Sequence, residues 1–206
     1  MPVYVVPQRM PATVFSADGV FWIGWALGDG HGYLGYVTPL LSTYPMKLLL
    51  QLLAILRAMH WAHWTAHWRM RGTPFYGDHL MFQRMYEELA GEVDSLAEKI
   101  IGTYGGNSVK DEHVISDAHR FITACETAVR DGDLYKRALM METYLQNAIK
   151  TTYDALKASG ELSLGMDDFL MALSNAHETN LYLLRQRSQP GGAAMLQNVV
   201  ARSLKG

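Results

Sequence analysis

Histidines and carboxylates at helical spacing, between residues 60 and 98, are the side chains in this sequence best suited to chemistry. His60, His63 and His67 are three and four residues apart, so in a helix they lie on one face. A second group follows, in chain order His79, Gln83, Glu87, Asp94 and Glu98. Imidazoles and carboxylates set in apolar helices are the ligands of non-haem iron and zinc sites. The pattern therefore predicts a metal site.

The second group lies along one stripe of a helix, but its two ends are far apart. His79 and Gln83 are one turn apart, and so are Asp94 and Glu98. At about 100° and about 1.5 Å per residue, His79 and Asp94 are offset by roughly 60° and separated by about 22 Å. One metal ion cannot bind both within one chain. If two copies of the helix cross antiparallel, His79 of one copy lies beside Asp94 and Glu98 of the other, and an isologous dimer makes this contact twice.

The residues around these positions resemble the signature of the Dps family, the small ferritin-like proteins of starved bacteria. The matching elements are His67-Trp68, Gly72, Phe75, His79, Tyr86, Asp94 and Ala97-Glu98, then Asp168-Phe169-Leu170, His177-Glu178 and Leu181-Tyr182-Leu183-Leu184-Arg185. The resemblance covers roughly residues 46 to 188. It implies an all-α, ferritin-like four-helix bundle.

The Dps resemblance also implies a ferroxidase centre shared between subunits. Iron would bind at His67 and His79 of one subunit and at Asp94 and Glu98 of its two-fold partner. Peroxide or dioxygen would oxidise Fe²⁺, and ferric mineral would collect inside a closed cage of twelve subunits. Trp68, beside the iron, would take up oxidising equivalents.

Four further residues are weaker candidates for metal ligands. Gln83 stands where the family usually has an Asp, and its amide oxygen can ligate without bringing a charge. Because iron favours carboxylate oxygen, we expect the second iron of a di-iron site to bind weakly. Glu87, one turn further along, is a possible substitute. His60 and His63 fit a role as ligands or as hydrogen-bonded interface histidines.

Two rival functions fit parts of the pattern. A structural cage or scaffold with a decayed ferroxidase site would explain Gln83. A DNA-compacting role is supported only by the family resemblance. The net charge is −2, and the ends of the chain hold few Lys and Arg residues to contact phosphates. We therefore do not expect DNA binding.

An oxidase with a di-iron site inside one bundle is disfavoured by the sequence. Such sites take Glu residues from two helices and Glu-x-x-His motifs from the other two. The chain contains no Glu-x-x-His motif, and no carboxylate occurs between Asp29 and Asp78.

Length and composition fit one soluble domain. The chain has 206 residues, of which 49% are hydrophobic and 18% charged, and this is enough to bury a core. The single Cys125 cannot form an internal disulfide, which favours a reducing, cytoplasmic location. The apolar run at residues 20 to 25 is too short to span a bilayer, and no signal peptide is recognisable at the start.

Three regions are predicted along the chain. Residues 1–45, rich in proline and glycine, are expected to form an irregular or short-stranded extension, residues 46–188 the bundle, and residues 189–206 a tail. Five helices are predicted. The first begins at Pro45, and the second runs from Thr73-Pro74 to about Ile101, with Gly102 as the stop. The others run from about Lys110 to Arg130, from after Asp133 to Ser159 with Gly160 beyond, and from about Asp167 to Arg187. The third of these is an extra helix in the central linker.

Overall fold

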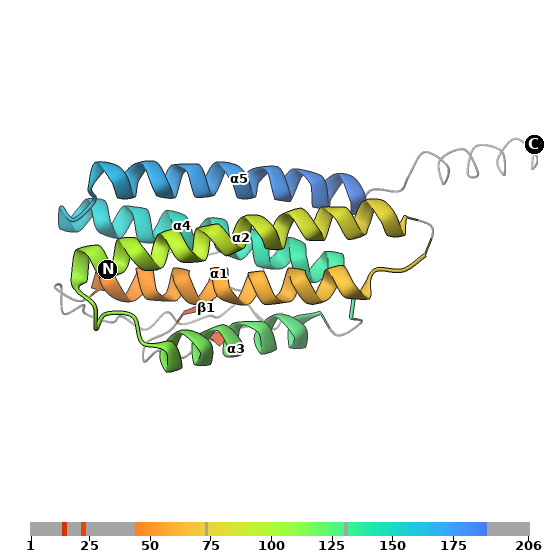
Figure 1. Ribbon diagram of the computed structural model, residues 1–206, viewed down its shortest axis with the longest axis horizontal. Coiled ribbons are helices and arrows are strands. Elements are labelled where there is room, and N and C mark those ends of the chain that lie inside the picture. Colours follow the sequence, from red (N-terminus) through yellow and green to blue (C-terminus); the bar gives the residue numbers. More distant parts are fainter. Residues whose placement is uncertain (1–13, 16–21, 24–43, 73, 130–131, 189–206) are drawn as a thin grey trace, which may run out of the picture.

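The computed structural model describes residues 14–15, 22–23, 44–72, 74–129 and 132–188. Four long helices form the bundle: α1 (Tyr44–Arg69), α2 (Phe75–Tyr104), α4 (Leu134–Ser159) and α5 (Leu164–Ser188). Helix α1 runs antiparallel to α2, and α4 antiparallel to α5 (Figure 1). The crossover from α2 to α4 contains α3 (Asp111–Ala128), which packs along the outside of α1. The predicted all-α four-helix bundle with an extra linker helix is confirmed.

The described parts of the N-terminal extension are two short strands. Strands β1 (Val14–Phe15) and β2 (Trp22–Ile23) pair antiparallel, with Val14 opposite Ile23 and Phe15 opposite Trp22. The sequence left open whether residues 1–45 form an irregular or a short-stranded extension. The rest of that segment up to residue 43, and the predicted tail at 189–206, lie outside the described residues.

Apolar side chains spaced three or four residues apart on each long helix form the core. Fully buried examples are Leu49, Leu52, Leu56 and Met59 on α1, Leu89, Leu96 and Ile100 on α2, Met141 and Leu145 on α4, and Leu184 on α5. Burying one such side chain contributes about 1.5–3 kcal/mol. This packing, rather than intrinsic helix propensity, holds the helices in register.

The extra helix α3 covers the outer side of α1 with a short apolar face. Its buried residues are Ala118, Phe121 and Cys125, spaced three and four apart. Burial raises the pKa of the Cys125 thiol to about 12, so the side chain is a protonated, unreactive part of the core. None of the helices in the described ranges is both long and apolar enough to cross a membrane.

Two helix boundaries predicted from the sequence are wrong. Helix α2 continues through Gly102 and ends at Tyr104, where Gly105 adopts a φ of 91° and its N–H bonds to the Ile101 carbonyl. A glycine inside a helix costs about 1 kcal/mol relative to alanine, and the core packing of the neighbouring Tyr104 offsets that cost. Helix α5 begins at Leu164 rather than Asp167, because the Ser163 hydroxyl accepts a hydrogen bond from the Met166 N–H (3.2 Å).

The remaining helix ends lie close to the prediction. Helix α4 starts after Asp133, whose carboxylate accepts hydrogen bonds from the N–H groups of Tyr135 (2.9 Å) and Lys136 (3.0 Å). It ends at Ser159, and the following Gly160 is in the left-handed region, with a φ of 75°. Helix α3 is slightly shorter at both ends than the predicted range.

Candidate metal centre

His67 and His79 lie against each other where α1 turns into α2. His67 is in the last turns of α1 and His79 is near the start of α2. The chain reverses between them at Gly72, which has a φ of 88°, a conformation that favours glycine. The two imidazole rings stack with centroids 3.6 Å apart and an interplanar angle of 25°. The structure thus brings together two of the predicted ligands that are twelve residues apart.

Each histidine of this pair is oriented by a backbone carbonyl of the other. The Nδ1 atom of His67 lies 2.9 Å from the carbonyl oxygen of His79, and Nδ1 of His79 lies 3.1 Å from that of His67. The carbonyls can only accept, so each Nδ1 must carry the proton. In the neutral form of each ring, the other nitrogen, Nε2, is then the one with the lone pair. Histidine ligands of metal sites have this arrangement, in which the second ring nitrogen donates to a carbonyl and fixes the tautomer.

The His67 carbonyl is free to accept because it belongs to the last turn of α1, where helical carbonyls have no partner within the helix. His79 therefore both caps the end of α1 and fixes its own ring. The arrangement needs neither a metal ion nor a second subunit.

Aromatic rings surround the histidine pair. Tyr86 contacts His67 edge-on at 5.4 Å, and Phe75 lies 5.0 Å from His79, both between ring centroids. Trp68, the predicted sink for oxidising equivalents, follows His67 and is 55% exposed. It packs on Trp61 at 5.9 Å and on Trp64 at 5.3 Å. The histidine pair is therefore bordered by an aromatic surface that is partly open to solvent.

The predicted carboxylate ligands, Asp94 and Glu98, are on a different part of α2. Both side chains are exposed, fifteen and nineteen residues beyond His79 in the same helix. Within the part of one chain that the structure describes, no three His, Cys, Asp or Glu side chains are grouped so as to hold a metal ion. Completion of a site by a partner's carboxylates remains a prediction.

Gln83 and Glu87 interact with each other one turn beyond His79. The Gln83 amide nitrogen donates a hydrogen bond of 2.8 Å to the Glu87 carboxylate. Because the nitrogen faces Glu87, the amide oxygen remains as a neutral donor atom for a metal. Glu87 is exposed, and its role as a substitute ligand stays a prediction.

The other two histidines of α1, His60 and His63, have different surroundings. His63 is buried inside the bundle, where its ring contacts Phe82 and its Nε2 lies 3.4 Å from the Glu142 carboxylate. His60 is half-buried and lies 3.4 Å from the Arg57 guanidinium. Burial, and then the nearby Arg57 and His63, lower the pKa of His60. Of the three histidines, only His67 pairs with His79.

Asp167 and Asp168, which the sequence places near the start of the last helix, lie one turn into α5. One carboxylate oxygen of Asp167 is buried without a hydrogen-bond partner among the described residues, and Asp168 is exposed. Negative charge is favourable near a helix N-terminus.

A buried cluster of ionisable side chains, the core ion cluster, was not predicted from the sequence. Each of the four bundle helices contributes one member: His63 from α1, Glu92 from α2, Glu142 from α4 and His177 from α5. His177 Nδ1 lies 2.6 Å from Glu142, and its Nε2 lies 3.0 Å from Glu92. His63 faces the other Glu142 oxygen without the geometry of a hydrogen bond.

The core ion cluster holds a charged pair in the bundle interior. Burial opposes the charge on His177, but its hydrogen bonds to Glu142 and Glu92 outweigh burial and raise its pKa to about 10. Burial likewise disfavours the Glu142 carboxylate, yet its contacts with His177 and His63 lower its pKa. At neutral pH the cluster therefore contains a His177 imidazolium hydrogen-bonded to the Glu142 carboxylate. Such a pair is costly to break, because one charge is then left buried and unpaired.

Solved structures of Dps proteins match this architecture over most of the chain. Dps from Thermosynechococcus elongatus superposes with a TM-score of 0.60 at 15% identity, covering 73% of this chain and 94% of that one. DpsC from Streptomyces coelicolor gives 0.60 at 22% identity, covering 78% and 92%. The chain has the Dps fold. No protein-family model and no curated protein sequence matches it.

A third solved structure has the same fold. The Dps protein of Vibrio cholerae, described as a member of a broad superfamily of ferritin-like diiron-carboxylate proteins, matches with a TM-score of 0.59 at 16% identity, covering 76% of this chain and all of that one. At such identities the likeness establishes the Dps fold alone, so function must be argued from the site.

Proposed function

We propose that this protein is an iron-oxidising, iron-storing shell protein that takes Fe²⁺ as its substrate. The observation that carries the proposal is the stacked pair of His67 and His79. Their reciprocal Nδ1 bonds to backbone carbonyls select, for each neutral imidazole, the tautomer whose Nε2 can bind a metal. Two neutral imidazoles fixed before the metal arrives lower the entropic cost of binding it.

Carboxylates from a two-fold partner would complete the site. Imidazoles bring no negative charge, and iron in non-haem sites is commonly held by histidine together with carboxylate. Asp94 and Glu98 are exposed on the same helix as His79, so antiparallel crossing of two α2 helices places them beside the partner's histidines. Trp61 and Trp68, 47% and 55% exposed, support an interface here, because aromatic residues are enriched in interface cores.

The proposed reaction transfers electrons from iron to an external oxidant. Two Fe²⁺ ions supply the two electrons that reduce one hydrogen peroxide to water. Four Fe²⁺ ions supply the four electrons that reduce one dioxygen to water. Trp68, next to His67 in the sequence, would take up surplus oxidising equivalents. Dimers would assemble into a closed cage of twelve subunits that stores the ferric product, in the cytoplasm.

The test of this function is Fe²⁺ oxidation by the purified protein, followed by stopped-flow absorbance. We expect peroxide or dioxygen to oxidise Fe²⁺ faster in the presence of protein than in buffer. The variant His79→Ala, measured beside the parent protein, should lose the acceleration while keeping its helical circular dichroism. Equal rates for the protein and for buffer would rule the function out.

A structural cage with an inactive site is the second candidate, and Gln83 favours it. This residue removes one negative charge from the proposed site, and its amide is engaged with Glu87. An intact oligomer that accelerates oxidation with neither oxidant would support the scaffold. DNA binding is not proposed, because the net charge is −2.

A further inference from the structure

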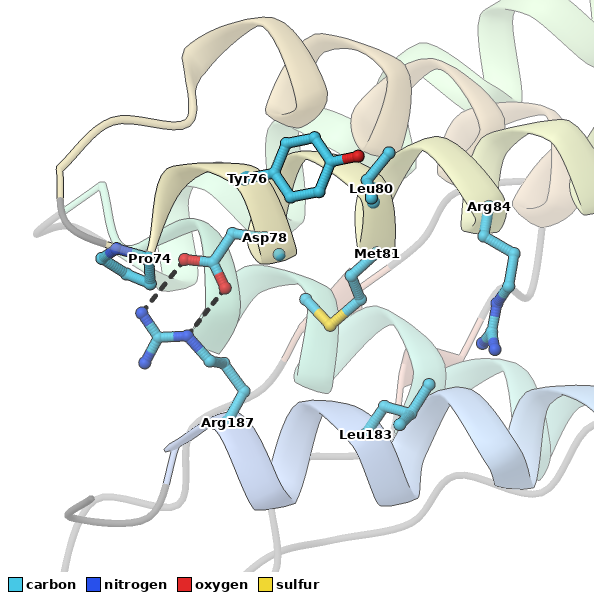
Figure 2. A pocket seen from close by; sticks show the side chains of 9 residues that line it. Pro74, Tyr76, Asp78, Leu80, Met81, Arg84, Leu183 and Arg187 are labelled. Carbon is cyan, nitrogen blue, oxygen red and sulfur yellow. Dashed lines mark hydrogen bonds and ion pairs between the residues drawn. The ribbon is translucent and has the colours of Figure 1, made fainter. Parts of the chain in front are cut away.

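An open apolar groove lies between the start of α2 and the end of α5 (Figure 2). Its volume is about 580 Å³. Tyr76, Leu80 and Met81 line it from α2, and Leu183 lines it from α5. Tyr76 is 72% exposed and Leu80 42% exposed. Large apolar side chains gathered at one exposed groove indicate a surface that another segment covers.

The walls of the groove are held in place by polar contacts at both ends. At one end, Arg187 donates two hydrogen bonds to the buried Asp78 carboxylate, at 2.7 and 3.1 Å. At the other end, the Arg84 guanidinium donates to the Asn180 side chain. Both contacts join α2 to α5. The groove is thus formed before any occupant arrives, so little ordering is needed on binding.

The chain itself contains a suitable occupant, which follows the end of α5 in the sequence. Helix α5 ends at Ser188, one residue after Arg187, and eighteen residues follow, 189–206. Pro190, Gly191 and Gly192 come first, and these residue types favour a reversal of the chain. Beyond them the sequence contains Met195, Leu196, Val199 and Val200, and its only charged side chains are Arg202 and Lys205.

We propose that the apolar part of this C-terminal segment, residues 193–200, binds in the groove of its own chain. Leu183 is five residues before Ser188, about 7.5 Å along the helix, so a segment that reverses at residues 190–192 reaches the groove at once. Attachment to the same molecule also gives the segment a high effective concentration, in the millimolar range for short linkers. A second copy of the chain has no such advantage.

Docking of the tail would brace one side of the candidate metal centre. His79 stands between two residues of the groove, Asp78 and Leu80. A tail packed on Leu80 and Met81 would therefore hold the start of α2 against α5. The proposal itself does not depend on iron chemistry, since it rests on the groove and the sequence of the tail.

Cysteine pairs in the full-length, metal-free protein test the proposal. Leu80→Cys is combined with one of four tail substitutions: Met195→Cys, Leu196→Cys, Val199→Cys or Val200→Cys. The native Cys125 is buried and does not interfere. A disulfide needs Cα atoms within about 7 Å, so mild oxidation should link at least one pair within a single chain, at least tenfold faster than a control pair. The control joins the same tail cysteine to Ile115→Cys, which is exposed on α3.

Non-reducing gels and mass spectrometry separate the outcomes. A disulfide within one chain supports the proposal. Disulfides formed only between two chains would overturn it, because another copy would then occupy the groove. Linkage no faster than in the Ile115→Cys control would also overturn it.

Discussion

His67 and His79 hold each other through the main chain: the Nδ1 atom of each ring lies within 3.1 Å of the other residue's carbonyl oxygen. The contact joins the last turns of α1 to the start of α2. It fixes the tautomer and the orientation of both rings in a single chain. In the proposed metal site, this pair would be formed within one subunit, and a two-fold partner would supply the carboxylate ligands.

Removing one ring of this pair should abolish rapid iron oxidation. In His79→Ala the metal loses a ligand, and His67 loses the ring that stacks on it. We expect the initial rate of Fe²⁺ oxidation to fall by about 100-fold, at the upper end of losses for metal-site partners. His113→Ala, at an exposed position on α3, is the matched control and should keep the parental rate. An unchanged rate in His79→Ala would place the iron chemistry elsewhere.

Restoring a carboxylate at position 83 should strengthen the site. In Gln83→Asp the site regains a negative charge one turn from His79. We expect tighter binding of the second iron by about tenfold, equivalent to about 1.4 kcal/mol. Anaerobic titration calorimetry with Fe²⁺ measures this, with Gln186→Asp at an exposed position of α5 as the control. Equal affinity in Gln83→Asp and the parent would show that residue 83 is not a ligand.

Sharing of the site between subunits predicts complementation of two inactive variants. His79→Ala and Asp94→Asn should each be inactive alone. When the two chains are mixed during refolding or coexpressed, random pairing in two-fold dimers restores about a quarter of the sites. The matched control mixes His79→Ala with His67→Ala, which restores none because both histidines come from one subunit. If the first mixture is as inactive as the control, the shared site is wrong.

The core ion cluster predicts a loss of stability at alkaline pH. The pKa of His177 is raised from 6.5 to about 10 in the folded protein, so the stability it contributes is complete below about pH 6.5. That contribution should decline as the pH rises from 6.5 and be gone above pH 10. Because its folded pKa is lowered, Glu142 contributes stability that should be lost on acidification instead.

Variants of His177 test the cluster by urea unfolding at several pH values. His177→Gln leaves the Glu142 carboxylate buried without its cation and should lower the free energy of unfolding by about 3–5 kcal/mol at pH 6. The difference from the parent should shrink as the pH approaches 10. His113→Gln, an exposed histidine, should change neither quantity. A constant difference between pH 6 and pH 10 would show that His177 is not charged in the folded state.

The four-helix bundle could be predicted from the sequence because apolar residues recur regularly along its helices. Apolar residues recur every three or four positions along α1, α2 and α4, and each helix follows from that period. The wrong end of α2 at Gly102 has a physical reason: local propensity favours a stop there, but packing beyond it keeps the helix going to Tyr104. The start of α5 depended on one serine hydroxyl at Ser163.

The candidate site was only partly predictable. The register of His67 and His79 placed them on facing helices, but their mutual carbonyl bonds depend on the exact turn at Gly72. The core ion cluster was missed because His177 occupies a position in the apolar stripe of α5, between Leu173 and Leu181. A lone histidine in such a stripe does not reveal which carboxylates from other helices reach it.

The most direct test of the shared iron site is a crystal structure of the protein soaked in Fe²⁺ without oxygen, with anomalous diffraction measured at the iron edge. The account predicts anomalous peaks about 2.0–2.3 Å from Nε2 of His67 and of His79, with Asp94 and Glu98 of a two-fold partner as the other ligands. Iron found only elsewhere, for example in the core ion cluster, or held at His67 and His79 with no partner carboxylate, would contradict it.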